Sequence, residues 1–274
     1  SKDSEYTKSI KSKIIRYLFG KRAGLKMLNS PRNKAFEIFN GKIKYTKQYN
    51  SVDELYRNPP VFDYYVSGSD QIWNPNLNVV NEPYFLTFVK HGVKISYASS
   101  FAINELSSEQ SLIYSRWLES YSTISVREED GLHIIKNMGL SVPSTCVLDP
   151  TFLLTSEKWK SLAKIVPEDE PFIFVYLLHE NETINSYIRD IAKRYCYKVK
   201  MVISDTAAVV PNDFESLMNI GPDEWIGYIY SSKCVFTDSF HCTVFSLLME
   251  KSFQTITTNT AVSSRMKNML EKFG

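Results

Sequence analysis

The segment from Thr237 to Cys242 places a histidine where a buried strand is expected to end and a helix to begin. Asp238 or Ser239 can cap this helix, and His241 falls in its first turn. The N–H groups at a helix N-terminus suit an anion such as phosphate. The helix dipole disfavours a cationic imidazole there, which favours a change of protonation state near neutrality. The pattern indicates an anion-binding or acid–base site, and a histidine that only packs remains the alternative.

A second candidate is Arg127, which directly follows a strand expected over residues 123–126. Its guanidinium suits a carboxylate or phosphate through paired hydrogen bonds. The acidic residues that follow, from Glu128 to Asp130, could instead neutralise it structurally. The sequence favours neither reading over the other.

A third candidate is the loop from Gly68 to Pro75, which also follows a strand. Glycine permits close backbone approach, Asp70 could act as an acid or base, and Trp73 could stack on a sugar ring. An Asx-type turn with a core tryptophan is the structural alternative. A further loop over residues 96–101 carries hydroxyls that could bind phosphate, and a second helix is expected to begin at Gly221. The candidate binding residues are therefore Gly68, Ser69, Gln71, Trp73, Ser99, Ser100, Gly221, Ser239 and Phe240.

Alternating strand and helix patterns must position these loops, and such alternation predicts α/β layers with parallel sheets. The apolar run over 172–178 is typical of a parallel strand covered on both faces. Ser107 and Gln110 form a capping-box pattern, and Gly139 is in the usual place for a helix end. We expect residues 40–60 to be irregular and residues 149–151 to be a hinge between units 1–150 and 151–274. Strands are expected over 61–66, 94–98, 123–126, 145–148, 172–178, 199–204, 234–237 and 253–257, and helices from 10 to 18, 107 to 118, 129 to 138, 181 to 196, 222 onward, 239 to 251 and 262 to 273.

Composition limits the function classes. The 274 residues carry a net charge of only +2, which argues against a general nucleic-acid binder. The charge is uneven: residues 1–50 hold 13 Lys and Arg against 3 Asp and Glu, a net of +10, and the rest carry 19 minus 27, or −8. The basic end is either a solvated helical face or a contact for an anionic membrane or glycolipid.

Cysteine usage and hydropathy indicate a cytoplasmic protein. The four cysteines form no C-x-x-C pair, which fits buried thiols in a reducing compartment, and the four scattered histidines argue against zinc. We find no signal-peptide pattern and no apolar run long enough to span a membrane. The expectation is a cytoplasmic protein, with peripheral contact at the inner face of the membrane as the alternative use of the basic end. The chain also lacks a P-loop and the G-x-S-x-G pattern of hydrolases.

Six motifs, in order over roughly residues 60–257, resemble the polysaccharide pyruvyl transferase family: 66–75 (VSGSDQIWNP), 84–86 (YFL), 94–101 (KISYASSF), 124–129 (ISVREE), 147–151 (VLDPT) and 239–241 (SFH). The resemblance implies two Rossmann-like domains facing a cleft, as in B-type glycosyltransferases. It also implies phosphoenolpyruvate as donor, with no metal or other cofactor. The acceptor would be a sugar diol of a bacterial surface polysaccharide or its lipid-linked precursor, and the product a pyruvate ketal.

By the same resemblance His241 would serve acid chemistry or contact the donor phosphate, and Arg127 would bind the donor anion. Asp70 would act on the acceptor side, in the first domain, with the donor side in the second. The chain departs from the family pattern in two places. Residues 1–50 lack the strand and loop with which the first domain usually starts, and Cys242 stands where glycine is common.

Two alternatives stay open. A B-type glycosyltransferase could use the same strand-end loops to hold the diphosphate of a nucleotide sugar. A non-catalytic glycan-binding relative would fit if the first domain lacked its initial strand. The acceptor sugar, ketal stereochemistry and oligomeric state are not predicted.

Overall fold

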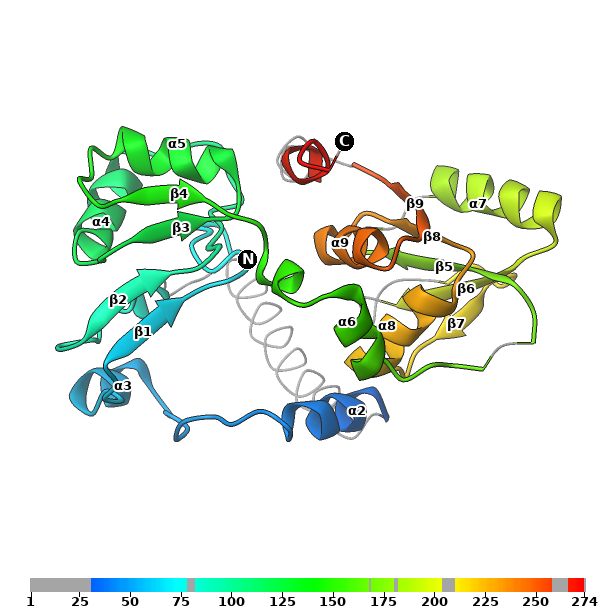
Figure 1. Ribbon diagram of the computed structural model, residues 1–274, viewed down its shortest axis with the longest axis horizontal. Coiled ribbons are helices and arrows are strands. Elements are labelled where there is room, and N and C mark those ends of the chain that lie inside the picture. Colours follow the sequence, from blue (N-terminus) through cyan, green and yellow to red (C-terminus); the bar gives the residue numbers. More distant parts are fainter. Residues whose placement is uncertain are drawn as a thin grey trace, which may run out of the picture.

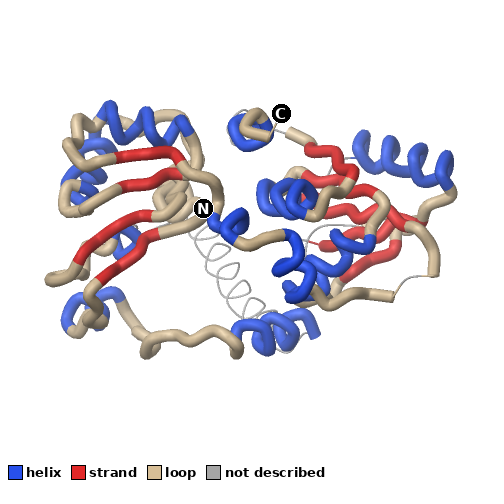
Figure 2. The backbone as a smooth tube through the Cα atoms, viewed as in Figure 1, coloured by secondary structure: helices blue, strands red, loops and turns tan. Residues whose placement is uncertain are grey.

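The computed structural model describes residues 31–77, 82–167, 169–179, 182–203, 210–257 and 266–273. Within them, strands form two groups, each flanked by helices (Figures 1 and 2). All the strand pairs are parallel. The predicted class, α/β with Rossmann-like units, is therefore confirmed.

The first group consists of four short strands lying side by side (Figure 1). β1 pairs with β2 and β3 with β4, and an isolated bridge between Ile95 and Thr123 joins the two pairs. The carboxyl ends of these strands therefore meet along one edge, where ligands gather in open α/β sheets. The bounds are β1 Tyr64–Ser67, β2 Val93–Ser96, β3 Ile124–Val126 and β4 Ser144–Cys146.

Helices α4 (Ser108–Leu118) and α5 (Glu129–Asn137) cover this group. Their ends follow the sequence signals: Ser107 and Gln110 form the predicted capping box, and Gly139 follows α5 with a φ of +70°. The 3-10 turn η1 (Glu82–Phe85) adds Phe85 to the core beneath α4. That core is largely aromatic, and its fully buried members include Trp73, Phe85, Phe101, Leu118 and Ile124.

The second group is a five-stranded sheet in the order β7-β6-β5-β8-β9. β5 lies at its centre and is almost entirely buried, as its continuous apolar run predicts. One face packs on α7 (Glu182–Tyr195) through Ile188, and the other packs on α8 (Pro222–Ser231) and α9 (Phe240–Leu248) through Ile229 and Phe245. The strands are β5 Phe172–Leu177, β6 Lys198–Ile203, β7 Glu215–Leu217, β8 Cys234–Thr237 and β9 Ser252–Thr255.

The chain passes between the two groups after residue 149, through the turn η2 (Pro150–Leu153) and helix α6 (Ser156–Leu162). A second crossing is made by the C-terminal residues, of which 266–270 are helical. Met266 and Met269 pack on α9, whereas Lys272 reaches Glu129 of α5 at 3.8 Å. The C-terminal end therefore contacts elements of both strand groups.

Two elements of the first 60 residues differ from expectation. Residues 40–60 were expected to be irregular, but α3 (Val52–Arg57) forms there because Ser51 caps it and Glu54 accepts from the Asn50 amide. α2 (Pro31–Asn40) packs on α8 of the second strand group, although a division at residue 150 assigns it to the first. Neither helix buries a side chain fully.

Several boundaries shift by a few residues. The strand expected from Val61 begins at Tyr64, and the helix expected to reach Lys251 ends at Leu248. The first predicted helix, with Ile10, Ile14, Ile15 and Leu18, lies outside the described residues. The prediction that residues 1–50 lack the family's initial strand is tested only over 31–50, which contain α2 and no strand.

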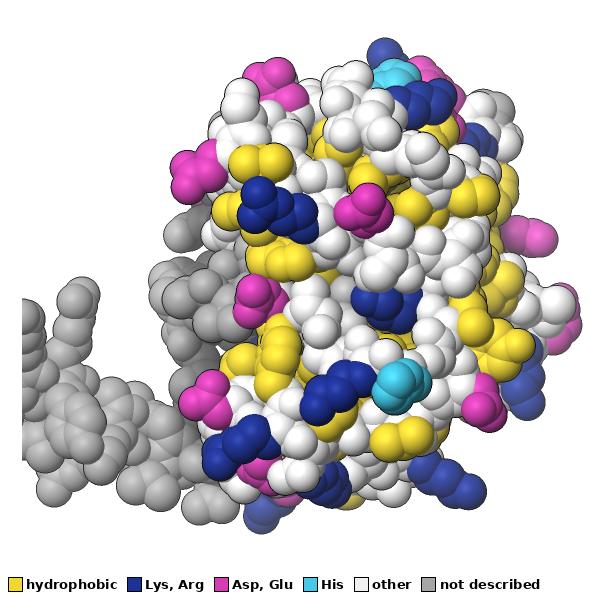
Figure 3. Space-filling view, turned by 90° about the vertical axis from the view of Figure 1, so that its left-hand side faces the viewer, with side chains coloured by type: hydrophobic (Ala, Val, Ile, Leu, Met, Phe, Trp, Pro, Cys, Tyr) yellow, Lys and Arg dark blue, Asp and Glu magenta, His cyan; other side chains and the backbone are white. Residues whose placement is uncertain are grey.

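The surface of the first group mixes apolar and charged side chains (Figure 3). Tyr64 and Val66 of β1 are 69% and 55% exposed, so one face of this edge strand is open in the described part of the chain. Within the described residues, no helix is long and apolar enough to cross a membrane.

Candidate active site between the strand groups

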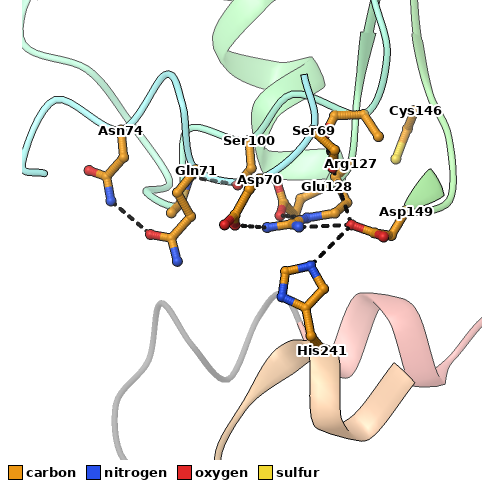
Figure 4. A network of polar contacts seen from close by, with 12 residues as sticks. Ser69, Asp70, Gln71, Asn74, Ser100, Arg127, Glu128, Cys146, Asp149 and His241 are labelled. Atoms are coloured by element: carbon orange, nitrogen blue, oxygen red, sulfur yellow. Dashed lines mark hydrogen bonds and ion pairs between the residues drawn. The ribbon is translucent and has the colours of Figure 1, made fainter. Parts of the chain in front are cut away.

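Arg127 is the centre of a buried charged network (Figure 4). It follows β3, and its side chain is only 2% exposed. Nε donates to Glu128 at 3.0 Å and Nη1 donates to Asp149 at 2.9 Å, while the guanidinium lies 4.3 Å from the centroid of the Phe240 ring. Burial alone would lower the pKa of Arg127, but the two carboxylates outweigh it and raise that pKa. Arg127 is therefore a fixed cation.

Asp149 ties the network together from the link between the strand groups. Its Oδ2 accepts from Arg127 and, at 3.2 Å, from the Ser69 hydroxyl, and Oδ1 accepts from the backbone and hydroxyl of Thr151 at 3.0 and 2.8 Å. Burial opposes its ionisation, but contacts with His241, Thr151 and Arg127 dominate and hold the pKa of Asp149 well below its usual range. Asp149 is therefore a carboxylate throughout the neutral range.

One arm of Arg127 remains without a hydrogen bond. Nη2 is buried and has no such partner among the described residues; its nearest charge is Asp70 Oδ1 at 3.5 Å. The Asp70 side chain is 62% exposed, so this ion pair has one buried and one solvated member. A buried, positively charged N–H of this kind could donate to an anion entering from the side of Asp70.

His241 approaches the network from the second strand group (Figure 4). It lies in the first turn of α9, with its Nε2 3.7 Å from Asp149 Oδ2 and its side chain 41% exposed. Ser239 caps the helix by accepting from the Cys242 amide at 3.4 Å, as predicted for one of the two candidate caps. The first intrahelical bond runs from Thr243 N to Ser239 O, so the amides of Phe240 and His241 have no partner within the helix. The His241 imidazole and the Phe240 ring thus bring the first turn of α9 into contact with the Arg127 network.

A second histidine at the same sheet edge is oriented by a buried carboxylate. Asp238 is 3% exposed and accepts from the amides of Leu178 and His179 at 2.6 and 3.1 Å. Its Oδ2 also contacts His179 Nδ1 at 2.8 Å, and the His179 side chain is 56% exposed. Asp238, considered in the sequence only as a cap, therefore connects the ends of β5 and β8.

A cavity of about 440 Å³ opens beside His241, at the carboxyl ends of the second sheet. Ser239 and His241 line it together with Gly221 and residues of α2 and α8. In the described residues, no group of three or more His, Cys, Asp or Glu is arranged to hold a metal ion.

The structure brings several predicted residues together. Ser69, Asp70, Arg127 and His241 all belong to the network, through Asp149 or Arg127 itself. Ser239 and Phe240 lie at its α9 side. Gln71 lies beside Asp70 and accepts from Asn74 at 3.0 Å.

Other predicted binding residues are corrected. Trp73 cannot stack on a sugar, because it is completely buried and stacks on Phe85 at 5.2 Å. Ser99 and Ser100 are also completely buried; Ser99 donates to the Ser67 carbonyl and Ser100 accepts from the Ala102 amide. Their hydroxyls serve the loop structure rather than a ligand.

The two candidate glycines also differ from expectation. Gly68 permits close approach of the Tyr97 carbonyl, which would lie 2.1 Å from a Cβ at this position, rather than of a ligand. Gly221 lines the cavity, but its amide donates to Glu224 at 2.9 Å. The α8 N-terminus is thus partly satisfied by its own acidic first turn. Cys242, which stands where the family commonly has glycine, is completely buried in the core of the second strand group.

The sequence reading missed two functional candidates. Asp149 was interpreted as a hinge, and His179 was not singled out. The motif of residues 147–151 contained the signal for Asp149, because a carboxylate directly after a strand lies at the same sheet edge as Arg127. Nothing local marked His179, since its partner lies 59 residues away.

Comparisons with known proteins agree with the motifs. The family model described as polysaccharide pyruvyl transferase matches residues 6–259. Comparison with curated proteins finds no match.

Several solved structures are similar in fold at low identity. UDP-GlcNAc 2-epimerase from Methanocaldococcus jannaschii is 10% identical, with a TM-score of 0.46 over 85% of this chain and 81% of that one. UDP-N-acetylglucosamine 2-epimerase from Rickettsia bellii is 8% identical, with a TM-score of 0.44 over 67% and 63%. Arabidopsis thaliana UGT89C1 complexed with quercetin is 10% identical, with a TM-score of 0.42 over 70% and 53%.

Proposed function

This chain belongs to the polysaccharide pyruvyl transferase family, and we propose that it transfers a pyruvyl group from phosphoenolpyruvate to a sugar diol, forming a ketal. The observation that carries the proposal is the buried Arg127 Nη2, which has no hydrogen bond among the described residues and lies 3.5 Å from Asp70 Oδ1, in a guanidinium that also contacts the Phe240 ring of α9. A fixed cation with a free donor is what a small dianionic or trianionic substrate requires.

Phosphoenolpyruvate has two anionic ends, a carboxylate and a phosphate, and the site offers two kinds of group that can bind an anion. Arg127 would bind one anion, and the Phe240 and His241 amides with the positive end of the α9 dipole would bind the other. The Ser239 hydroxyl oxygen already accepts a hydrogen bond from the Cys242 amide as the helix cap, so we do not assign it to the bound anion. Donor binding would thus involve both strand groups, with most contacts from residues 239–241.

The reaction needs a proton on the methylene carbon of the donor, followed by attack of a sugar hydroxyl at the adjacent carbon. The carbon–oxygen bond to phosphate then breaks, the second hydroxyl closes the ketal, and inorganic phosphate leaves with one of the hydroxyl protons. His241, whose Nε2 lies 3.7 Å from Asp149 Oδ2, would supply the first proton or hold the phosphate. Arg127 and the α9 amides would stabilise the charge on the departing phosphate.

Asp70 is the candidate for the acceptor side. It is the exposed acidic member of the network, so it could accept a proton from a hydroxyl without being held by several buried donors. The acceptor would be a bacterial surface polysaccharide or its lipid-linked precursor, reached in the cytoplasm at the inner face of the membrane. The basic N-terminal stretch, net +10 over residues 1–50, supports that peripheral contact. The proposal includes no nucleic-acid partner, metal or cofactor.

The test is phosphate release from phosphoenolpyruvate with a panel of glycan diols, combined with calorimetry of donor binding. We expect donor binding without acceptor and phosphate release with the matching diol. Absence of both would contradict the proposal. Thermal stabilisation by a nucleotide sugar but not by phosphoenolpyruvate would favour a glycosyltransferase instead.

A further inference from the structure

Closing a ketal removes a proton from each of two sugar hydroxyls, and only one of these protons has an assigned acceptor. Asp70 is the exposed candidate for the hydroxyl that attacks first. Glu128 and Asp149 are buried and held by Arg127 at 3.0 and 2.9 Å, so neither is placed to serve the second hydroxyl. A further proton acceptor near the departing phosphate would complete the reaction.

Asp238 connects the ends of two neighbouring strands at this place. β5 and β8 pair in parallel with Tyr176 opposite Thr237, and the Thr237 hydroxyl donates to the Tyr176 carbonyl at 2.6 Å. One residue further along, the Asp238 carboxylate accepts from the amides of Leu178 and His179 at 2.6 and 3.1 Å, and its side chain is 1% exposed. Because each of its oxygens accepts a backbone N–H, this group has the hydrogen-bond pattern of an ionised carboxylate.

The same carboxylate sets the tautomer of the His179 imidazole. Asp238 Oδ2 lies 2.8 Å from His179 Nδ1, and an ionised carboxylate can only accept, so Nδ1 carries the proton of this contact. In a neutral ring Nε2 then holds a lone pair. In the described part of the chain Nε2 has no hydrogen-bond partner, and the His179 side chain is 56% exposed. His179 is therefore arranged as a proton acceptor with a fixed orientation.

This pair lies on the sheet edge that faces the Arg127 network. β8 leads through Asp238 and the cap Ser239 into α9, whose His241 lies 3.7 Å from Asp149. β5 runs parallel beside β8, so its carboxyl end, followed by His179, reaches the same edge. Asp238 directly precedes the α9 N-terminus, where the proposed function places an anionic end of the donor.

We propose that His179, positioned by Asp238, takes the proton of the second sugar hydroxyl as the ketal ring closes. This inference rests on the proposed function. Once the carbon–oxygen bond to phosphate has broken, the second hydroxyl oxygen bonds to the former donor carbon, its O–H bond breaks, and the proton moves to Nε2. The imidazole then returns that proton to the departing phosphate, which leaves as hydrogen phosphate.

Loss of this acceptor has a specific chemical consequence. Without His179 the second hydroxyl closes the ring slowly, and a water molecule can attack the electron-poor carbon in its place. The product is then a hemiketal, which separates into free pyruvate and the unchanged diol, while the water proton goes to solvent. A residue that only stabilises the fold would lower all products together.

The test is the fate of the pyruvyl group in His179→Gln, with phosphoenolpyruvate and a panel of glycan diols. Ketal is measured by mass spectrometry, pyruvate by coupled reduction with lactate dehydrogenase, and phosphate by colorimetry. We expect ketal formation to fall about 100-fold, phosphate release to fall less, and pyruvate to appear together with phosphate. Calorimetry should give the wild-type affinity for phosphoenolpyruvate, which shows that the variant is folded. Ketal formation at the wild-type rate, or equal losses of ketal and phosphate without pyruvate, would overturn the inference.

Two further measurements complete the test. His91→Gln, at an exposed position just before β2, is the matched control and should release no pyruvate; pyruvate from this variant would also count against His179. Nitrogen-15 NMR of the wild-type imidazoles, with His179 assigned from its variant, should show the proton of the neutral ring on Nδ1. A proton on Nε2 would contradict the proposed orientation.

The wild-type protein separates this inference from the proposed function. If it neither binds phosphoenolpyruvate nor releases phosphate with any diol, both proposals fail. If it forms the ketal and His179→Gln does so equally well, only the role of His179 fails.

Discussion

Arg127 and Asp149 face each other across the point where the chain leaves the first strand group, with Nη1 and Oδ2 2.9 Å apart and both side chains 2% exposed. Arg127 follows β3, and Asp149 caps η2. Since His241 of α9 contacts the same carboxylate oxygen at 3.7 Å, this one pair relates residues of both strand groups. The site therefore depends on a link segment as much as on the sheets.

Replacing Arg127 by lysine tests whether the forked guanidinium is needed. Lysine keeps the charge but cannot reach Glu128, Asp149 and a ligand together, so kcat/KM should fall about 100-fold. Steady-state kinetics with varied phosphoenolpyruvate measure the loss. Arg116→Lys on the exposed side of α4 is the matched control and should keep full activity. Unchanged kinetics for Arg127→Lys would rule out a forked contact.

Asp149→Asn should reduce stability by about 3–5 kcal/mol at neutral pH, because it leaves a buried guanidinium with one fewer carboxylate. The pKa of Asp149 is lowered by folding, so its contribution is present above the unfolded pKa of about 3.9 and declines as the pH falls toward the folded value. Denaturant unfolding between pH 7 and pH 3.5 should show the gap between wild type and variant narrowing below about pH 4. Asp190→Asn on exposed α7 is the control, and a gap that widens in acid would contradict the assignment.

Local signals made much of the scaffold predictable. The apolar run of β5, the Ser107–Gln110 capping box and Gly139 each act within a few residues of their own position. The same is true of α3, whose Ser51 and Glu54 have the spacing of a capping pattern. Whether a given aromatic side chain is buried could not be predicted in this way. The sequence allowed Trp73 to contact a sugar or to join the core, and the choice depends on its stacking against Phe85, which forms only in the folded domain.

The site itself was predictable only in part, for the same reason. Arg127 and His241 could be predicted because each follows the end of a strand. Their common partner Asp149 could not, because its contacts are between distant segments; Ser69, for example, lies 80 positions away in the sequence. The contact between α2 and α8 likewise could not be predicted, because it joins a helix from the basic N-terminal region to a largely apolar helix far along the chain. Periodicity carries no information on such pairings, since it reports only on one element at a time.

Asp70 and a donor anion compete for Arg127, which Asp70→Asn can test. The exposed carboxylate lies 3.5 Å from Nη2, and a screened pair of this kind contributes up to about 1 kcal/mol. Its removal should tighten phosphoenolpyruvate binding up to about five-fold. If Asp70 also accepts the hydroxyl proton, kcat should fall about 100-fold or more, so KM and kcat move in the same direction. Weaker donor binding in the variant would show that Asp70 does not oppose the anion.

The thiol of Cys242 offers a test of the packing behind the site. It is completely buried, and burial is the main factor that raises its pKa to about 12. Iodoacetamide at pH 8 should therefore label the exposed Cys196 in the native protein and leave Cys242 unmodified until denaturant is added. Peptide mapping by mass spectrometry distinguishes the sites. Rapid native labelling of Cys242 would mean that the core beneath α9 opens in the native protein.

His241 separates binding from chemistry most directly. Glutamine can still donate a hydrogen bond but cannot protonate a carbon, so His241→Gln should lower kcat by about 10²–10⁴ with little change in donor affinity if the imidazole is the acid. If His241 only contacts the phosphate, the variant should instead bind phosphoenolpyruvate more weakly and keep a larger share of kcat. Calorimetry and single-turnover phosphate release measure the two quantities independently. His133→Gln, on the exposed face of α5, controls for loss of a histidine and should match wild type. A variant with unchanged binding and turnover would exclude both roles and favour a non-catalytic relative.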